Sequence, residues 1–438
     1  MTRAVTHASL AKNGSPGNPL IDKAIKTVCI GLAVLTLLAL SLGYFYKKGE
    51  GELPVYTTAI ERMVDGSEIY RRDDGKAFTY PPFAAVPFLP FLALPTELHP
   101  ALWYIVYICV FFYVFRRLHL LVVDWAPGQS NRKQRRIFWI ILMLLVARHL
   151  SSVFESKAND ILMLLLMFEA ARLAADQRYR LVGMWAGVAA AFKATPWLFL
   201  PVLVWQRRFI AAAILLAAAI AAHLIPDLLF PRSARGSWTM SWYSTFLADV
   251  SLDKPVDAEG AWTAWNHLNQ SLTATLYRLS TPFDPSAVHA LNINLWQLEG
   301  KSLSVLNIAA QLTVLLLVVI ATKPIASSTG LQRFGQVGAV LCGMLLLSPM
   351  SSKSHFAVLI IPLSFCVMEF LRDLRRMVIG IHLGVVFLMG TLTSKGIIGK
   401  DLGNQVLALG SVTWITLATL TATTYALHRK PIAAQHNG

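Results

Sequence analysis

The chain has 438 residues, of which 55% are hydrophobic and only 14% are charged, whereas about 25% of residues in soluble domains are charged. With a mean hydropathy of +0.53, this composition excludes a soluble enzyme, a disordered chain and a fibrous repeat. It indicates an all-α polytopic membrane protein. The net charge of +15 would suggest nucleic-acid binding in a soluble protein, but in a membrane protein the positions of the charges matter more than their sum. We therefore expect no nucleic-acid partner.

Apolar runs that can cross a bilayer as helices, about 20 residues each, recur along the chain. They lie at residues 27–46, 98–115, 137–152, 159–175, 209–230, 302–322, 334–350, 355–371, 377–394 and 404–427. Residues 181–206 are interrupted by Lys-Ala-Thr-Pro at 193–196. Proline breaks a helix interior but suits a first turn. Residues 181–206 therefore predict a hairpin of two short helices that turns at this motif. Together these runs predict about twelve membrane segments, with a cavity beside the hairpin.

Lysine and arginine clusters mark the cytoplasmic side of a membrane protein. With twelve crossings, every cluster falls on the side of the N-terminus, which predicts that both termini are cytoplasmic. The clusters lie at residues 116–117, 132–136, 172–180, 207–208, 372–376 and 429–430. The opposite side then carries two long loops, 47–97 and 231–300. Loops of this length are uncommon unless they are functional, so we expect the chemistry on the extracytoplasmic face.

The same pattern predicts how the chain is divided. We expect a disordered cytoplasmic N-terminus at residues 1–25, one membrane domain at 26–430 and a cytoplasmic tail at 431–438. The sequence contains no HExxH pattern, paired-cysteine motif or nucleotide-binding loop, so we expect neither a resident metal nor a nucleotide cofactor. Acidic residues in the outer loops leave metal dependence open.

Three charged residues on the predicted outer side stand out. Glu52 follows the first membrane segment, where a carboxylate could accept a proton from a sugar hydroxyl, although a solvated loop acid is the simpler interpretation. Asp160 opens a predicted helix, and favouring its positive end is a simpler role for it than catalysis. Lys193 lies among apolar residues, and a cation there either marks a functional site or extends to the membrane surface.

The second long loop combines indoles with neutral hydrogen-bonding side chains. Residues 262–272 contain two tryptophans and end in Asn269, Gln270, Ser271 and a leucine, a combination that suits a sugar. An interfacial helix explains the aromatic residues equally well but explains the three polar residues less well. Arg278 follows, and its guanidinium offers paired donors to a phosphate.

A last polar group lies between two predicted membrane helices. Residues 347–355 read Leu-Ser-Pro-Met-Ser-Ser-Lys-Ser-His, so they join Lys353, His355 and several hydroxyl groups at the membrane surface. This combination favours phosphate binding or proton handling over simple helix capping.

Taken together, these motifs resemble those of the GT-C integral-membrane glycosyltransferases, and among them family 87, the bacterial polyprenol-phosphate-mannose-dependent α-mannosyltransferases. The matching segments are Glu52-Leu53-Pro54-Val55-Tyr56, Gly66 with Tyr70, Tyr80-Pro81-Pro82, Lys193 with Pro196, Asn269-Gln270-Ser271-Leu272 with Arg278, and Leu347-Ser348-Pro349-Met350-Ser351 with His355. The family's usual aspartate is glutamate at position 52. Its W-x-H-H is Ser-Lys-Ser-His at 352–355, so the substrate can differ.

The resemblance implies a GT-C fold and an inverting single displacement. The donor would be a mannose-like hexose on a polyprenyl phosphate, and the acceptor a lipid or glycan outside a bacterial plasma membrane. Glu52 would be the base, and His355 a second catalytic residue. Charge stabilisation of the departing phosphate would fall to His355 and the donor-binding residues. The donor phosphate would contact Lys193, Arg278 and Lys353, and the substrates would contact Tyr56, Tyr80, Asn269, Gln270, Ser271 and Asp160.

Two other functions compete with the enzyme. A flippase or transporter of a lipid-linked sugar would use charged residues along a path, and such proteins often show inverted repeats and broken helices at the midplane. This chain has one broken hairpin, no visible repeat and its polar loops on one face, which favours the enzyme. A non-catalytic assembly partner that kept the scaffold is the third possibility, because the family's aspartate is replaced at Glu52.

Overall fold

The computed structural model describes residues 51–71, 74–127, 131–248, 250–256, 261–325, 327–373 and 376–429, and, in the first predicted membrane segment, residues 27, 35, 38–39 and 41–45. This described part is all-helical, without a strand, as the composition predicts. The predicted N-terminal segment 1–25 and tail 431–438 lie outside it. The described residues of segment 27–46 are helical.

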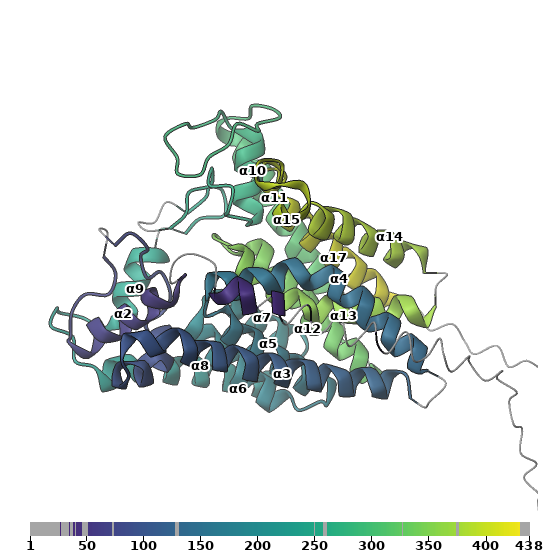
Figure 1. The fold of residues 1–438 in the computed structure, drawn as a ribbon, viewed down its shortest axis with the longest axis horizontal. Coiled ribbons are helices and arrows are strands. Elements are labelled where there is room, and N and C mark those ends of the chain that lie inside the picture. The colour runs from purple at the N-terminus through teal and green to yellow at the C-terminus, as the bar shows by residue number, and fades with distance from the viewer. Residues whose placement is uncertain are drawn as a thin grey trace, which may run out of the picture.

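The other predicted membrane segments coincide with helices or joined helices (Figure 1). Six are single helices: α3 (His99–Trp125), α4 (Arg132–Ser156), α5 (Asp160–Ala175), α8 (Phe209–Leu229), α11 (Gly300–Ala321) and α12 (Gly330–Leu347). Three are compound: the 3-10 helix η4 (Lys353–Leu359) with α13 (Ile360–Arg372), α14 (Met377–Val386) with the π-helix η5 (Phe387–Leu392), and α16 (Lys400–Ala408) with α17 (Ser411–His428). The last pair is bent by 55°, and the short α15 (Lys395–Ile398) precedes it.

The predicted hairpin is present. α6 (Tyr179–Phe192) ends at Lys193, whose backbone is extended with φ −155° and ψ 144°. The 3-10 helix η3 (Thr195–Leu198) and α7 (Phe199–Trp205) then lead away, with Pro196 in the first turn, where its missing N–H costs nothing. The sequence therefore located this break correctly, and it leaves Lys193 at the tip of the hairpin.

Fewer of the described helices meet the length needed for a membrane crossing than the twelve segments that the sequence predicts. Judged by length and apolar composition, six described helices can cross a membrane, and the bent α16–α17 pair would be a seventh. The six are α3 (extended by the short η2, Thr96–Leu98), α4, α8, α11, α12 and the η4–α13 pair. Helices α5, α6, α7 and α14 are shorter than this criterion requires. The protein is thus a multi-pass membrane protein, and the total of twelve segments stays a prediction.

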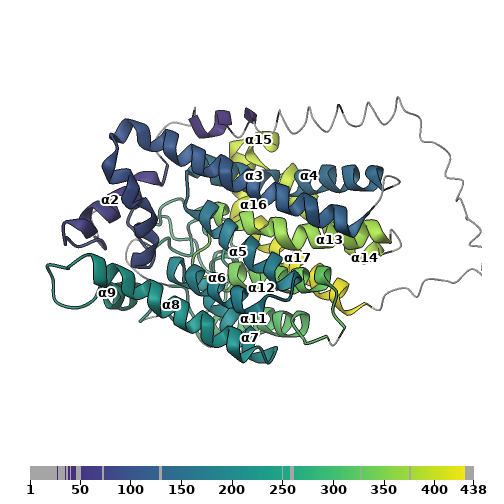
Figure 2. The same cartoon turned by 90° about the horizontal axis from the view of Figure 1, so that it is seen from below.

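Two elements form the interior of the bundle. In an apolar stretch of 18 residues from each helix, 89% of the η4–α13 stretch and 78% of the α12 stretch are buried. The corresponding share is 28% for α3 and for α11. Figure 2 shows α12 and α5 between α3 on one side and α8 on the other. The turn that joins α12 to η4 therefore emerges from the centre of the bundle, not from its edge.

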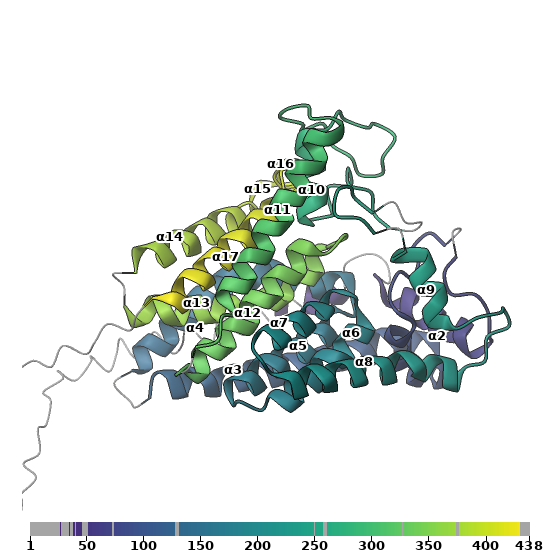
Figure 3. The ribbon, with the colours of Figure 1, turned by 180° about the vertical axis from the view of Figure 1, so that it is seen from behind.

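The two long loops, predicted to lie on the outer side, contain helices in their described parts. The first contains α2 (Leu53–Val64) and the 3-10 helix η1 (Pro82–Ala93), and the second contains α9 (Trp238–Phe246) and α10 (Leu272–Ser280). Figures 1 and 3 show α2 and α9 at the end of the molecule away from the place where α3 ends and α4 begins. Segments far apart in the sequence are thereby gathered at one end of the bundle.

Candidate active site

Glu52 lies at the start of α2 and is held there by hydrogen bonds of both its side chain and its backbone. Its carboxylate accepts a 2.7 Å hydrogen bond from the Tyr56 hydroxyl one turn later, and that hydroxyl accepts a 3.1 Å bond from the Asn159 backbone N–H. Its own backbone N–H donates to the Ser156 carbonyl at 2.7 Å. Gly51 allows this approach, because its φ is +67° and a Cβ there would lie 2.4 Å from the same carbonyl oxygen. The carboxylate is thus fixed against the end of α4.

The turn between α4 and α5 is fixed from α3. α4 ends at Lys157, which adopts a left-handed conformation with φ 53°. The Trp103 indole N–H donates to the Lys157 carbonyl at 3.1 Å, and the Tyr107 hydroxyl donates to the Ala158 carbonyl at 2.6 Å. These bonds satisfy buried carbonyls and define where Asp160 begins α5.

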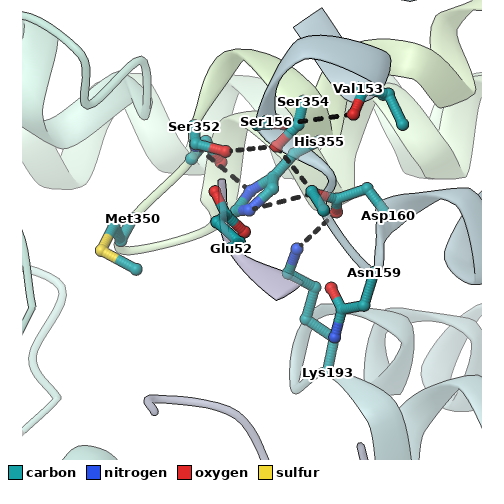
Figure 4. Close-up of polar contacts among 12 residues, drawn as sticks. Glu52, Val153, Ser156, Asn159, Asp160, Lys193, Met350, Ser352, Ser354 and His355 are labelled. Carbon is teal, nitrogen blue, oxygen red and sulfur yellow. Dashed lines mark hydrogen bonds and ion pairs between the residues drawn. The ribbon is translucent and has the colours of Figure 1, made fainter. Parts of the chain in front are cut away.

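Asp160 is the centre of a buried polar cluster, drawn in Figure 4. Its Oδ1 lies 2.8 Å from Lys193 Nζ, and its Oδ2 accepts a 2.7 Å bond from the Ser354 hydroxyl. His355 Nε2 lies 3.9 Å from the same Oδ2. Both carboxylate oxygens thus bond to other elements, so Asp160 does more than stabilise the start of its helix. We refer to Asp160, Lys193, Ser354 and His355 as the Asp160 cluster.

The imidazole of His355 has a defined orientation. The Ser352 backbone N–H donates to His355 Nδ1 at 3.3 Å, so Nδ1 is the acceptor and a neutral ring carries its proton on Nε2, facing Asp160. The hydroxyls of Ser352 and Ser354 are 2.7 Å apart. Sequence reasoning quoted these serines within a motif but did not name Ser354 as a site residue, because its bond to Asp160 spans 194 positions.

A cavity of about 660 Å³ opens beside Glu52, and we call it the central cavity. Its size falls in the usual range for small-molecule sites. The residues that contribute polar or aromatic side chains to its wall include Glu52, Lys76, Tyr80, Trp262, Asn266, His289, Ser352 and His355. They come from both long loops and from the α12–η4 turn. Sequence reasoning missed Lys76 and His289, and no motif around them points to a site.

Lys193 does not line this cavity but lies beside Tyr80, which does. Its ammonium group is 5.4 Å from the centre of the Tyr80 ring, and its side chain is 16% exposed. The side chain is therefore neither freely exposed nor sealed in the core. Lys76 Nζ donates to the carbonyl of Gly51, the residue before Glu52, at 2.7 Å. Two cations, Lys193 and Lys76, thus act electrostatically on the Glu52 carboxylate.

The environment of Glu52 shifts its acidity. Burial, together with the negative charge of Asp160, raises the pKa of Glu52 to about 7, against the opposing effects of the Tyr56 hydroxyl, Lys193 and Lys76. A carboxyl group with such a pKa changes protonation state near neutral pH, as a general base requires. Among the described residues, no three His, Cys, Asp or Glu side chains gather as a metal site would require.

Arg278 is placed differently from its predicted role. It is 3% exposed on α10, and one terminal nitrogen donates to the carbonyls of Ala264, Asn266 and Asn269 at 2.8–3.0 Å. Its Nε donates to the Ala408 carbonyl at 3.1 Å. It does not line the central cavity. These contacts hold the tryptophan-rich loop in place, and phosphate binding by Arg278 stays a prediction.

The polar residues Asn269, Gln270 and Ser271 connect the second long loop to the turn between α12 and η4. Asn269 Oδ1 accepts bonds from the backbone N–H groups of Ser271 and Ser351, both at 3.2 Å. The Gln270 backbone N–H donates to the Ser351 carbonyl at 2.7 Å. These side chains are buried, so they fix the turn that carries His355, and their role as substrate contacts stays a prediction. Lys353, at the start of η4, does not line the cavity.

We expect Arg278→Gln to lower the free energy of unfolding by about 3 kcal/mol, because several buried carbonyls lose a charged donor. Thermal unfolding of the purified protein would measure this. If the chain uses the lipid-linked sugar donor that the resemblance implies, the donor concentration for half-maximal transfer should stay at its wild-type value in the folded fraction. An unchanged unfolding temperature with a raised half-maximal concentration would instead assign Arg278 to the donor phosphate.

Comparison with known proteins adds a second kind of observation. The family model of glycosyltransferase family 87 matches residues 78–349, more than half of the chain. That range includes Tyr80, Lys193 and Arg278, whereas Glu52 and His355 lie outside it. Among solved structures, the crystal structure of ArnT from Cupriavidus metallidurans in the apo state is similar at 12% identity, with a TM-score of 0.39 over 91% of this chain and 77% of that chain. No curated protein sequence matches the chain.

Proposed function

Because the chain belongs to glycosyltransferase family 87, we propose that it transfers a mannose-like hexose from a polyprenyl-phosphate donor to a lipid or glycan acceptor. The family and the apolar helices make it a multi-pass membrane glycosyltransferase. We assign the reaction to the extracytoplasmic face of a bacterial plasma membrane. One observation supports the site most: the central cavity joins Glu52 to His355 from segments about 300 residues apart.

The proposed reaction is a single displacement at the anomeric carbon. Glu52 takes the proton of an acceptor hydroxyl as its oxygen bonds to the anomeric carbon. The bond from that carbon to the phosphate oxygen breaks, and its electron pair leaves with polyprenyl phosphate. Glu52 is a better base than Asp160, because it lines the cavity, whereas both oxygens of Asp160 are already bonded.

The Asp160 cluster provides the charge that this step needs. Negative charge grows on the phosphate oxygen as the bond breaks, and fixed cations in a dry site stabilise it strongly. Lys193 is the main candidate, since Asp160 holds its ammonium beside Tyr80. His355 would add its Nε2–H, and Lys353 would add charge at the start of η4. Asp160 then positions these groups and does not itself touch the substrate.

Transfer in vitro tests the proposed function. Purified protein in lipid nanodiscs would receive radiolabelled sugars on polyprenyl phosphate or on nucleotides, with membrane lipid extract as acceptor. We expect label in the acceptor from a polyprenyl-phosphate sugar and none from a nucleotide sugar. Failure with every donor, together with donor movement across vesicles, would contradict the enzyme and favour a flippase.

The raised pKa of Glu52 predicts the pH dependence of the rate. The base acts as a carboxylate, so the rate should fall about tenfold for each pH unit below the pKa of about 7 and level off above it. Initial rates of transfer at saturating donor between pH 5 and 8.5 would measure the profile. A rate that does not change between pH 5.5 and 8 would mean that no group with this pKa acts in the chemical step.

A further inference from the structure

A second cavity, of about 710 Å³, lies between the start of α6 and the start of α8. It is lined by residues 177–181 and 207–211, and four of these are arginines: Arg178, Arg180, Arg207 and Arg208. No carboxylate belongs to its lining. We call it the arginine pocket, and the catalytic assignments above make no use of it.

The arginine pocket lies at the other end of the helices from the Asp160 cluster. Asp160 begins α5 and Lys193 follows the end of α6, whereas the pocket surrounds the connection between these two helices. The 16 residues of α5 rise about 24 Å, which approaches the thickness of the hydrocarbon core of a bilayer. The pocket therefore lies near the opposite membrane surface, on the side of the basic clusters.

Close packing of α6 and α8 brings the two halves of the pocket together. A Cβ on Gly183 would lie 2.2 Å from the Ala211 carbonyl oxygen, and a Cβ on Gly187 would lie 2.4 Å from that of Leu215. The two helices thus touch backbone to backbone along one face, and Figure 2 shows them side by side. Their first turns are consequently neighbours.

Both turns have the same local geometry. Gln177 and Arg207 are left-handed, with φ 60° and 57°, and the following N–H groups of Arg178 and Arg208 each donate a 2.8 Å bond back to the preceding helix. Arg178 and Arg208 are thereby the N-cap residues of α6 and α8, and neither helix has a side-chain cap. Two uncapped helix starts, with their positive dipole ends, thus contribute to one cavity.

Among the described residues, no carboxylate is paired with the arginines of the pocket. Within the part of the chain that the structure describes, Arg178, Arg180 and Arg207 are exposed and form no ion pair. Arg208 lies 4.1 Å from the centre of the Tyr179 ring. The nearby Arg172, by contrast, is paired with Glu169 and Asp176. Four charges in one cavity without a carboxylate favour an anionic ligand with more than one acceptor oxygen.

Exposed apolar side chains adjoin the pocket on α7 and α8. Trp205 is 47% exposed, Phe209 is 62% exposed and Ile210 is 60% exposed. Phe209 and Ile210 also line the pocket. A soluble anion would make no contact with this apolar surface. A lipid, in contrast, carries acyl chains next to its phosphate that could pack against it. We propose that the arginine pocket binds the phosphate headgroup of an anionic membrane lipid, with its acyl chains against α8.

Lipid titration of the purified protein tests this site. Thermal unfolding in detergent would be followed against added phosphatidylglycerol, with phosphatidylcholine and sodium pyrophosphate as comparison ligands. We expect phosphatidylglycerol alone to raise the unfolding temperature. In the double variant Arg178→Gln with Arg207→Gln, half-saturation should need about 30-fold more lipid, since each surface charge contributes about 1 kcal/mol.

A matched control separates this pocket from general surface charge. Arg132 and Lys133 are exposed at the start of α4, so Arg132→Gln with Lys133→Gln removes the same charge from the same side. This control should keep wild-type half-saturation. An equal loss of lipid affinity in both double variants, or no loss in either, would contradict lipid binding in the arginine pocket. Pyrophosphate that stabilises as strongly as the lipid would overturn the lipid assignment in favour of a soluble phosphate compound.

The unfolding temperature measured without lipid shows whether the Arg178→Gln with Arg207→Gln variant folds normally. Arg178 and Arg207 form no ion pair in the described part of the chain, so the lipid-free unfolding temperature should match the wild type. Arg178→Lys with Arg207→Lys keeps the charge and should recover most of the lipid affinity. If this lysine variant binds no better than the glutamine variant, the charge-based account of the pocket is wrong.

Discussion

Replacement of Glu52 by glutamine should lower the rate of sugar transfer about 10²–10⁴-fold, the usual contribution of a general base. The amide keeps the size of the side chain and can still accept the bond from Tyr56, but it cannot take the proton of the acceptor hydroxyl. The donor concentration for half-maximal rate should change little. Initial rates with a labelled polyprenyl-phosphate sugar would measure both quantities.

Glu61→Gln is the matched control for this variant. Glu61 lies on the same helix, is exposed and does not line the central cavity, so its replacement should leave transfer at the wild-type rate. If Glu52→Gln transfers sugar as fast as Glu61→Gln, another group accepts the proton and the assignment of the base is wrong.

Replacement of Lys193 by methionine should reduce both transfer and stability. Asp160 would remain buried without its cation, and loss of one partner of a buried ion pair costs about 3 kcal/mol or more. Loss of the phosphate-stabilising charge should lower the rate about 10²–10³-fold, as for other groups that stabilise a developing anion. Thermal unfolding and initial rates on the same preparation would give the two effects.

A second variant separates these two effects. Lys193→Met with Asp160→Leu removes both charges, so stability should return towards wild type, while the rate should stay low. The exposed Lys301→Met should change neither property. If the double variant also recovers transfer, Lys193 serves only the fold and the phosphate charge comes from elsewhere.

Much of the helical fold could be predicted from the sequence, because apolar length and proline are local signals. The break at Lys193 is an example: Pro196 and the short halves on either side were sufficient to locate it. Charge placement likewise predicted that the two long loops carry the site, and residues of both line the central cavity. The number of crossings was harder, since α5, α6 and α14 are short and their passage through a membrane depends on their neighbours.

Side-chain partners in the site were less predictable, because they depend on distant contacts. Asp160 was predicted to contact substrate, and a role at the start of its helix was the simpler alternative, yet its partner Ser354 lies 194 positions away. Arg278 suggested a phosphate ligand from its chemistry alone, but four backbone carbonyls occupy its donors. No local pattern distinguishes a guanidinium that faces a cavity from one that supports the loop behind it.

The anomeric configuration of the product tests the central claim most directly. A single carboxylate base and one displacement require inversion, so a β-linked polyprenyl-phosphate hexose should give an α-linked product. Nuclear magnetic resonance of the purified product, made by the wild-type protein from a donor of known configuration, would determine the linkage. A β-linked product would mean retention, which a single displacement with Glu52 as base cannot give, and would contradict the account.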